Sequence, residues 1–243
     1  IDAELEDFGI AAMGKIPGVR GFTGSLSASQ ERGHVDIASD GMRVDLPELL
    51  DRPLDVDSMT GSVTWRSDSG RLLVISDRFS VSTPFLESTG DGDLTINSSG
   101  ESPQINLTMD WSISDVAVAK PYLPRRIMKP NLYNWFQNAL VRGSIPRGTL
   151  RLNGPLDKFP FDGDEGKLLV EGTARGLTFK YHPEWPAAEE TELDVVLDNR
   201  RLYSRRNRSL HVGNRSVDAA IEIGDLWQPV LTIDALVTGT LDS

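Results

Sequence analysis

The amino-acid sequence predicts a mainly β protein whose strands form an antiparallel sheet with one apolar and one solvated face. Three observations predict this fold class. Apolar and polar residues alternate along many segments, which places successive side chains on opposite faces of a strand. Turn-forming residues separate these segments, and no long helical pattern alternates with them, which disfavours a doubly wound parallel sheet. Only 39% of the 243 residues are hydrophobic, so the chain is lean in apolar side chains without being disordered by composition.

The first part of the chain contains mostly short alternating segments. Residues 1–16 are equally compatible with a helix or a strand, and residues 46–51 have the pattern of a single turn. Hairpin-like breaks are expected at 68–70, 90–92, 162–163 and 199–201. Together with the longer segments below, roughly a dozen strands are expected. The shorter strand candidates are residues 33–38, 61–66, 71–76, 79–83, 93–97 and 167–181.

The clearest strand candidate is the segment 104–114, with the sequence QINLTMDWSIS. Every second residue is apolar and the residues between are polar, so a strand here has one apolar face. The five apolar residues are Ile105, Leu107, Met109, Trp111 and Ile113. Other segments repeat this pattern, and their apolar members are Leu150 and Leu152 in 148–154, Leu193, Val195 and Leu197 in 192–198, Val217, Ala219, Ile221 and Ile223 in 216–224, and Leu231, Ile233, Ala235 and Val237 in 230–241.

One segment, 129–143, has apolar residues at helical spacing instead. Pro130 suits the first position of a helix and Gly143 suits the residue beyond its end, so the clearest helix is predicted over 130–142. A second, shorter helix is predicted from residue 114 or 115 to residue 120, where a proline follows. The apolar face of the longer helix consists of Leu132, Trp135, Phe136, Ala139 and Leu140.

The composition argues against several kinds of site. There is no cysteine, and the three histidines are scattered, which leaves little for zinc binding or nucleophilic catalysis. The formal net charge of −11 argues against a general nucleic-acid-binding protein. Residues 9–15 approach a phosphate-binding loop, but Ile16 stands where that loop needs Ser or Thr. We therefore predict no enzyme activity, no cofactor, no metal and no nucleic-acid partner.

Two groups of residues leave alternatives open. Six arginines, with no acidic residue among them, occur between Asp198 and Asp218. They suit an anionic membrane surface, or an exposed hairpin whose arginine stems cover apolar surface, and we favour the second. These residues are Arg200, Arg201, Arg205, Arg206, Arg208 and Arg215. The aromatic residues Trp111, Trp135, Phe136 and Trp185 suit a ligand site, although core packing explains each equally well.

An ordered set of short strings resembles the central region of the YhdP-type AsmA-like proteins of Gram-negative bacteria. No single string is specific, but the order and approximate spacing of the set are. The strings are PGVRGFTGSL at 17–26, LPELLDRPLDVDSMTGSVTW at 46–65, SPQINLTMDWS at 102–112, PYLP at 121–124, NWFQNALVRG at 134–143, DKFPFDGDEGKLLVEG at 157–172, YHPEWP at 181–186 and WQPVLTIDALVTGTL at 227–241.

The resemblance implies a section of a large periplasmic protein that an N-terminal helix holds in the inner membrane. Such proteins resemble bridge-like lipid-transfer proteins with repeated β-groove units, and are implicated in moving phospholipid towards the outer membrane and in its permeability barrier. Residues 1–243 would be one internal β-groove section, with a possible subdivision near 115–145 at the helical insert. The implied partners are phospholipid acyl chains, adjoining groove sections of the same protein, and a membrane reached through segments outside this chain.

A long, twisted antiparallel sheet that forms an open groove with one apolar face, plus one or two short helices, is therefore our predicted fold. Each shielded methylene is worth about 0.8 kcal/mol, and an apolar trough supplies that shielding without specific contacts. The alternative is a structural β-sandwich or interaction module of an envelope protein, where a second sheet covers the apolar face. The lipid-lining candidates are Ile105, Leu107, Met109, Trp111, Ile113, Leu150, Leu152, Leu231, Ile233 and Val237, with Leu132, Trp135, Phe136 and Leu140 on the helix.

Overall fold

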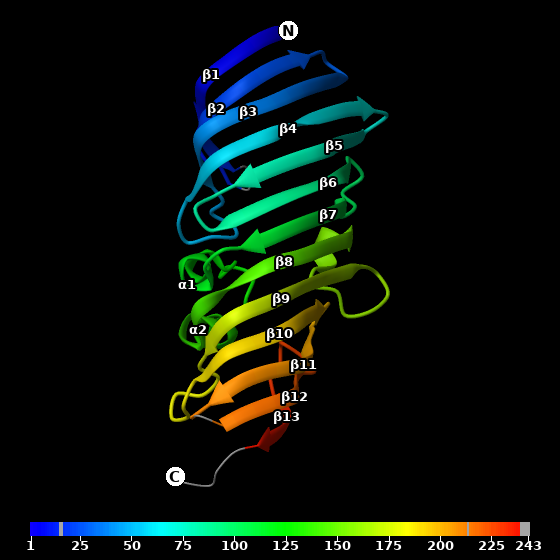
Figure 1. The fold of residues 1–243 in the computed structure, drawn as a ribbon. Coiled ribbons are helices and arrows are strands. Elements are labelled where there is room, and N and C mark those ends of the chain that lie inside the picture. The colour runs from blue at the N-terminus through cyan, green and yellow to red at the C-terminus, as the bar shows by residue number, and fades with distance from the viewer. Residues whose placement is uncertain (15–16, 213, 239–243) are drawn as a thin grey trace. The chain divides into compact units, whose positions relative to one another are not determined.

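The computed structural model describes residues 1–14, 17–212 and 214–238, except for the side chains of residues 205, 206, 211, 215 and 237. Thirteen strands follow one another across the sheet in the order of the chain, each hydrogen-bonded to the next (Figure 1). The successive pairs from β1 to β6 and from β9 to β13 are all antiparallel. The predicted fold class, a mainly β antiparallel sheet with short helices, is confirmed.

Most of the strands are long, and the helices are confined to the middle of the chain. The strands are β1 (Asp2–Ile10), β2 (Gly18–Ala28), β3 (Arg32–Asp45), β4 (Leu54–Asp68), β5 (Arg71–Ser82), β6 (Leu86–Asn97), β7 (Gln104–Ile113), β8 (Leu140–Pro155), β9 (Lys167–Phe179), β10 (Ala188–Asp198), β11 (Arg201–His211), β12 (Asn214–Ile223) and β13 (Leu231–Thr238). The helices are α1 (Val116–Ala119) and α2 (Pro130–Ala139), with 3-10 turns η1 (Lys120–Tyr122) and η2 (Leu156–Lys158). None of the helices in the described ranges is long and apolar enough to cross a membrane.

The predicted breaks between strands are right except at residues 90–92. Residues 68–70 and 199–201 turn the chain between β4 and β5 and between β10 and β11. The glycine-rich segment 90–92, however, lies inside β6. A Cβ atom at Gly90 would come within 2.7 Å of Cζ of Phe79, on the neighbouring strand β5. Gly90 therefore makes room for the aromatic ring of Phe79. The register of the β5–β6 pair shifts nearby, at a bulge between Ser76 and Phe79.

The predicted helices are right at their starts and differ at their ends. Pro130 is the first residue of α2, as expected, but the helix ends at Ala139 and the chain passes directly into β8. Gly143 does not cap the helix, because it lies within β8 at a φ of +126°. A Cβ atom there would lie 2.7 Å from Cα of Leu177. The shorter helix begins after Asp115, whose carboxylate accepts a hydrogen bond of 2.8 Å from the backbone N–H of Ala117.

The undecided segments adopt defined structures. Residues 2–10 are strand β1, and residues 47–49 form a turn in which the backbone N–H of Leu49 donates to the carbonyl of Leu46 at 2.9 Å. The strand candidates 71–76 and 79–83 join into the single strand β5. The near miss to a phosphate-binding loop begins in β1, and its Lys15 and Ile16 lie outside the described residues.

The chain divides into two compact units. Unit 1 comprises residues 1–110 and 150–168, and unit 2 comprises residues 111–149 and 169–243. In unit 1 the connection after β8 is anchored by Phe161, whose side chain is fully buried. Its ring lies so close to two glycines that a Cβ atom at Gly166 would be 2.4 Å from Cε1, and one at Gly154 would be 2.9 Å away.

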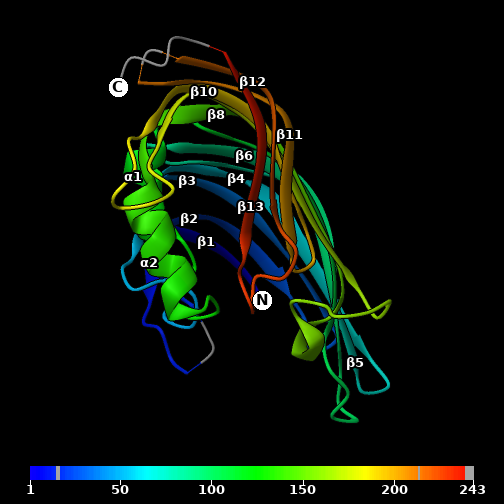
Figure 2. The same ribbon diagram turned by 90° about the horizontal axis from the view of Figure 1, so that it is seen from below.

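Unit 2 has a small core under its helices. Val116 of α1 packs against Ala174 and Leu177 of β9, and all three side chains are buried. Helix α2 is joined to the segment after β9 by a backbone hydrogen bond of 2.9 Å from the N–H of Lys180 to the carbonyl of Ala139. Figure 2 shows β10 and β11 bending, with α1 and α2 at one end of the bent strands. The helices therefore cover one end of the apolar face of this unit.

Candidate functional site

In unit 1 the register of the strands gathers apolar side chains on one face. Leu26 of β2 pairs with Val35 of β3, which pairs in turn with Val63 of β4. On the next pair of strands in the sheet, Val74 of β5 pairs with Leu94 of β6. Residues paired in register share a face of an antiparallel sheet, so each row is continuous from strand to strand. All five side chains are only half-buried, so no layer of protein seals them.

The opposite face of unit 1 carries side-chain hydrogen bonds between neighbouring strands, although Leu73 and Ile75 of β5 also lie on it. The hydroxyl of Ser27 donates to Oδ1 of Asp2 at 2.7 Å, across the β1–β2 pair. The amide of Asn106 on β7 donates to Oδ1 of Asp93 on β6 at 3.2 Å. Since neighbouring residues in a strand point to opposite faces, this second bond places Ile105 and Leu107 on the apolar face, beside Leu94.

Strand β7 shows the predicted alternation. Ile105, Leu107 and Met109 are half-buried, while Asn106 and Thr108 between them are exposed. Leu107 also lies against Gly92 of β6, where a Cβ atom would be 3.3 Å from Cδ1 of Leu107. In a closed sandwich these apolar side chains would be fully buried. Here they form an uncovered floor.

The last two candidates of β7 lie in unit 2 and are partly covered by protein. The ring of Trp111 lies over two glycines, because a Cβ atom at Gly148 would be 2.3 Å from Cε2 and one at Gly172 would be 3.2 Å from Cη2. Ile113 packs against the core cluster of Val116, Ala174 and Leu177. The apolar face is thus open at Leu107 and covered by α1 at Ile113.

The remaining strand candidates lie on β8 and β13. Leu150 and Leu152 of β8 are half-buried and alternate with the exposed Arg151 and Asn153. Leu231 and Ile233 of β13 line a cavity of unit 2, and Ile233 is 42% exposed at its rim. The side chain of Val237 lies outside the described residues.

The cavity of unit 2 has a volume of about 710 Å³ and an apolar floor. Leu193 of β10 lines the cavity and also packs against the core cluster under α1, so the cavity lies on the face that carries this helix. Paired positions of β12 and β13 extend the floor, where Ile221 pairs with Ile233. The apolar residues that line it are Ala188, Leu193, Ala219, Ile221, Leu231, Ile233 and Ala235.

Aromatic residues form one wall of this cavity. Phe179, Tyr181 and Trp185 line it. The indole N–H of Trp135 on α2 donates to the carbonyl of Tyr181 at 3.1 Å, and its ring meets that of Phe179 edge-on at 5.5 Å. Burial raises the pKa of the Tyr181 phenol, so this group stays neutral at physiological pH.

The predicted apolar face of the helix is therefore a packing face. Leu132 is buried, and Trp135 and Phe136 are half-buried with their rings 4.9 Å apart. Leu140 packs against the core cluster from the start of β8. Of the four candidate aromatic residues, Trp185 is the one that lines the cavity, while Trp135 positions the wall from behind.

Three polar residues of the cavity have no counterpart among the sequence candidates. They are Thr191 of β10, Asn207 of β11 and Ser216 of β12, and all three are buried. Alternation in 216–224 predicts that Val217 shares a face with Ala219, but Ser216 takes that place beside the cavity. Asp218 between them has a φ of +54°, and the register of β12 shifts there. This bulge moves the residues before it to the opposite face from the one that the alternation predicts, and the alternation itself does not indicate where the bulge lies.

The sequence model of the YhdP protein family matches residues 1–243. The chain belongs to the YhdP protein family. This confirms the resemblance of the ordered strings. One relative in the family is the protein named Intermembrane phospholipid transporter YhdP of Escherichia coli (strain K12), which is 24% identical over 226 residues. The aligned region covers 92% of this chain and 18% of that relative's length. No solved structure matches the chain significantly.

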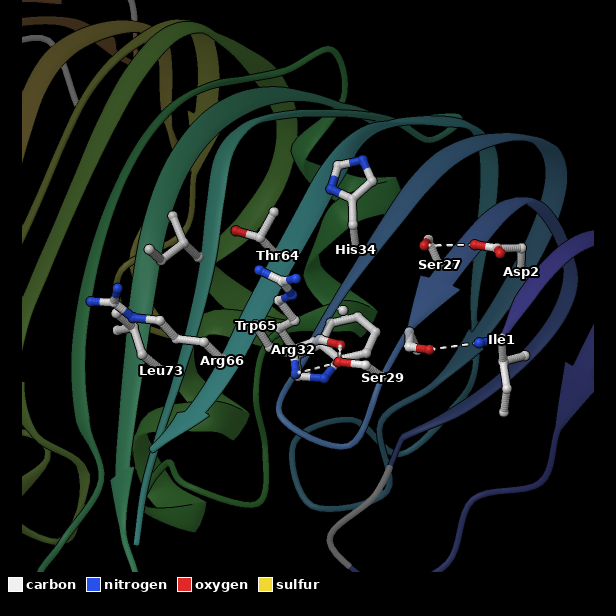
Figure 3. Close-up of a pocket in the computed structure, with 13 residues that line it drawn as sticks. Ile1, Asp2, Ser27, Ser29, Arg32, His34, Thr64, Trp65, Arg66 and Leu73 are labelled. Carbon is white, nitrogen blue, oxygen red and sulfur yellow. Dashed lines mark hydrogen bonds between the residues drawn. The ribbon is translucent and has the colours of Figure 1, made fainter. Parts of the chain in front are cut away.

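A second hollow of this YhdP-family chain lies in unit 1, between β1 and β5, and has a volume of about 700 Å³ (Figure 3). Some of its polar groups bond to one another. Ser27 donates to Asp2, the backbone nitrogen of Ile1 donates to the carbonyl of Ala28 at 2.8 Å, and Ser29 donates to the carbonyl of Arg32 at 3.1 Å. These bonds hold the first hairpins together.

The arginine-rich segment runs through β11, an inner strand of the sheet, into β12, which pairs with it as an antiparallel hairpin, and Arg201 and Arg208 are exposed. Arg200 forms a two-pronged ion pair with Asp225, in which Nε lies 2.9 Å from Oδ1, and its guanidinium stacks on Trp227 at 5.4 Å. Arg201 pairs with Glu222 at 2.9 Å. The side chains of Arg205, Arg206 and Arg215 lie outside the described residues. The described pairs give the first two arginines a structural role.

Proposed function

We propose that this chain is a section of a lipid conduit that carries phospholipid between the inner and outer membranes. The observation that carries the proposal is the uncovered apolar floor of β2 to β7 in unit 1, where paired rows of aliphatic side chains stay half-buried. Acyl chains are the partner that matches such a surface, because they need shielding from water and make no directed bonds. The name of the Escherichia coli relative supports a phospholipid as the cargo.

The energetics of this arrangement suit passage along the groove. Each shielded methylene contributes about 0.8 kcal/mol, so a lipid with two long acyl chains requires on the order of 20 kcal/mol of shielding. A floor of similar aliphatic side chains provides this shielding at each position along its length. Because neighbouring positions are nearly equivalent, a lipid can move along them without breaking a specific contact. The function requires neither a nucleophile nor a metal.

The wider setting belongs to the same proposal. The chain corresponds to 18% of the relative's length, and we place it as an internal groove section that joins others of its kind. We infer a periplasmic location in a Gram-negative bacterium, within a protein anchored in the inner membrane that supports the outer-membrane permeability barrier. Membrane contact would be made by segments outside this chain. A structural sandwich module would need a second sheet over the apolar floor, and the described part of unit 1 has none.

A photo-crosslinking amino acid placed on the two faces of β7 tests the proposal. The probe replaces Leu107 on the apolar face or, as the matched control, Thr108 on the polar face of the same strand. The purified chain is mixed with phospholipid vesicles and irradiated, and the adducts are identified by mass spectrometry. We expect phospholipid adducts at position 107 and few at position 108. Equal adducts at the two positions, or protein adducts alone at 107, would refute the conduit.

A further inference from the structure

The cavity of unit 2 contains a polar band in its otherwise apolar floor. The band crosses three neighbouring strands, with Thr191 on β10, Asn207 on β11 and Ser216 on β12. Ser209 of β11 pairs directly with Ser216, and Asn207 pairs with Ala219. All of these residues line the cavity, and Leu193, Ile221 and Ile233 flank them. The band is therefore a polar step across an apolar trough.

The polar atoms of the band lack partners within the described part of the chain. Oγ1 of Thr191, Nδ2 of Asn207 and Oγ of Ser216 are buried and form no hydrogen bond there. The residues are 4%, 2% and 6% exposed, respectively. Buried polar groups in folded proteins are nearly always hydrogen-bonded, so three neighbouring exceptions in one cavity point to an absent partner.

The orientation of Asn207 is set by a neighbour. The hydroxyl of Ser204 donates to Oδ1 of Asn207 at 2.5 Å, so the carbonyl end of the amide is already occupied. The NH₂ end is left to donate both of its hydrogens. Hydroxyl groups of Thr191 and Ser216 add two further donors. The band thus offers donors on three adjacent strands to an acceptor in the cavity.

The chemistry of the surroundings selects the acceptor. Within the described residues that line the cavity the only basic side chain is His182, and there is no lysine or arginine, so a phosphate there would lack a permanent counter-charge. Burying an uncompensated charge is strongly unfavourable. A neutral carbonyl oxygen attached to apolar chains fits both the donors and the flanking aliphatic side chains. The ester linkage of a diacyl lipid is such a group, with two carbonyls near each other.

We infer that the band formed by Thr191, Asn207 and Ser216 binds the ester carbonyls of a diacyl lipid whose acyl chains lie on the apolar floor. This inference rests on the proposed function and adds a site at which the lipid has a preferred depth. The glycerol backbone is held at the band, and the headgroup lies outside it. The site makes unit 2 selective for the linkage between headgroup and chains, whereas unit 1 is selective for apolar chains alone.

The experiment compares ester-linked with ether-linked lipids, because ether lipids of equal chain length and headgroup lack the carbonyl oxygens. A photo-crosslinker replaces Ile233 at the rim of the cavity, and labelled diacyl lipid is displaced by unlabelled diacyl or dialkyl lipid. We expect the diacyl lipid to displace the label at about fivefold or more lower concentration, as one or more hydrogen bonds imply. The same probe at Leu107 in unit 1 should show equal displacement by both lipids.

Variants separate the band from general effects on the chain. Thr191→Val, Asn207→Leu and Ser216→Ala, together, should abolish the ester preference at position 233. Ser88→Ala is the matched control, because Ser88 is also 6% exposed but lies in unit 1 and donates to the carbonyl of Val81. Equal displacement by both lipids in the unsubstituted chain would overturn the inference without any variant, and would leave the conduit intact. Absence of labelled lipid at both positions would instead overturn the conduit itself.

Discussion

Leu107 distinguishes an open floor from a sealed core. Its side chain is half-buried on the apolar face of β7, with no second layer over it in the described part of unit 1. We expect Leu107→Asp to lower the free energy of unfolding by less than about 1 kcal/mol, because the carboxylate stays hydrated. A charge in a sealed interior would cost several times more. Urea unfolding measures the stability, and lipid binding should be lost.

The control for this substitution is Thr108→Asp, on the exposed face of the same strand. It adds the same charge to β7 but leaves the apolar floor unchanged. Its stability and its lipid binding should both match the unsubstituted chain. Global unfolding of the Leu107→Asp variant, with Thr108→Asp folded, would show that the floor is covered by protein and would favour a structural module.

Gly148 is the position where the lack of a side chain matters most for Trp111. A Cβ atom there would lie 2.3 Å from Cε2 of the indole ring. Gly148→Ala forces the ring off the sheet, and we expect a loss of about 1–3 kcal/mol in the free energy of unfolding. Gly224→Ala is the control, since no atom lies within 4 Å of its added Cβ. Indole fluorescence should shift in the first variant alone, and an unshifted spectrum would contradict the packing described here.

The stability that the connection between β12 and β13 gives to the fold depends on pH through the carboxyl group of Asp225. The guanidinium of Arg200 and the backbone N–H of Trp227 hold the pKa of the Asp225 carboxyl below its usual value of 3.8. A lowered pKa in the folded state means that the stabilisation is fully present above the unfolded-state pKa. It is lost as the pH falls through the lower, folded-state pKa.

We therefore expect Asp225→Asn to lower the melting temperature at pH 7, with the difference from the unsubstituted chain shrinking as the pH falls through the lowered folded-state pKa of Asp225. Thermal unfolding followed by circular dichroism between pH 2.5 and 7 measures this. Asp234→Asn, on an exposed position of β13, is the control and should not change the profile. A difference between the Asp225 variant and the unsubstituted chain that does not shrink as the pH falls would contradict the ion-pair origin.

The whole chain should bind phospholipids with little regard to headgroup. The apolar floor of unit 1 contacts acyl chains alone, and the donors in unit 2 are placed for the ester linkage, which all diacyl phospholipids share. We expect the bound lipids to match the composition of a mixed phosphatidylethanolamine and phosphatidylglycerol source within about twofold, as equal binding energies imply. Native mass spectrometry after lipid extraction measures the ratio. Strong enrichment of one headgroup would reveal a specific headgroup site.

Several features of the fold follow from local sequence alone. The alternation in 104–113 predicted both the strand and the face of each residue, because a strand fixes the direction of successive side chains. Pro130 predicted the start of α2, because its fixed φ and missing N–H suit that position. The ordered strings predicted the YhdP family, and with it an apolar groove. Each of these inferences depends on neighbours in the chain and needs no knowledge of distant contacts.

Other features depend on contacts between segments far apart in the chain. The alternation marked Ile113 as lipid-lining, but the packing of α1 on β9 decides that protein covers it. Gly90 has the sequence of a turn, and only Phe79 on the adjacent strand explains why it continues β6. In the same way, α2 ends at Ala139 because β8 begins pairing there, although Gly143 is the better local cap.

The sequence by itself determined that the alternating segments are strands and that the sheet has an apolar face, since both follow from side-chain periodicity. Only the tertiary structure decided which polar residues meet in the cavity. Ser204 and Asn207 are three residues apart, yet they share a face because β11 has a bulge between them. A bulge inserts one residue and exchanges the faces of all that follow, so alternation cannot be carried across it. The buried donors of Thr191, Asn207 and Ser216 come together only when three such strands pair.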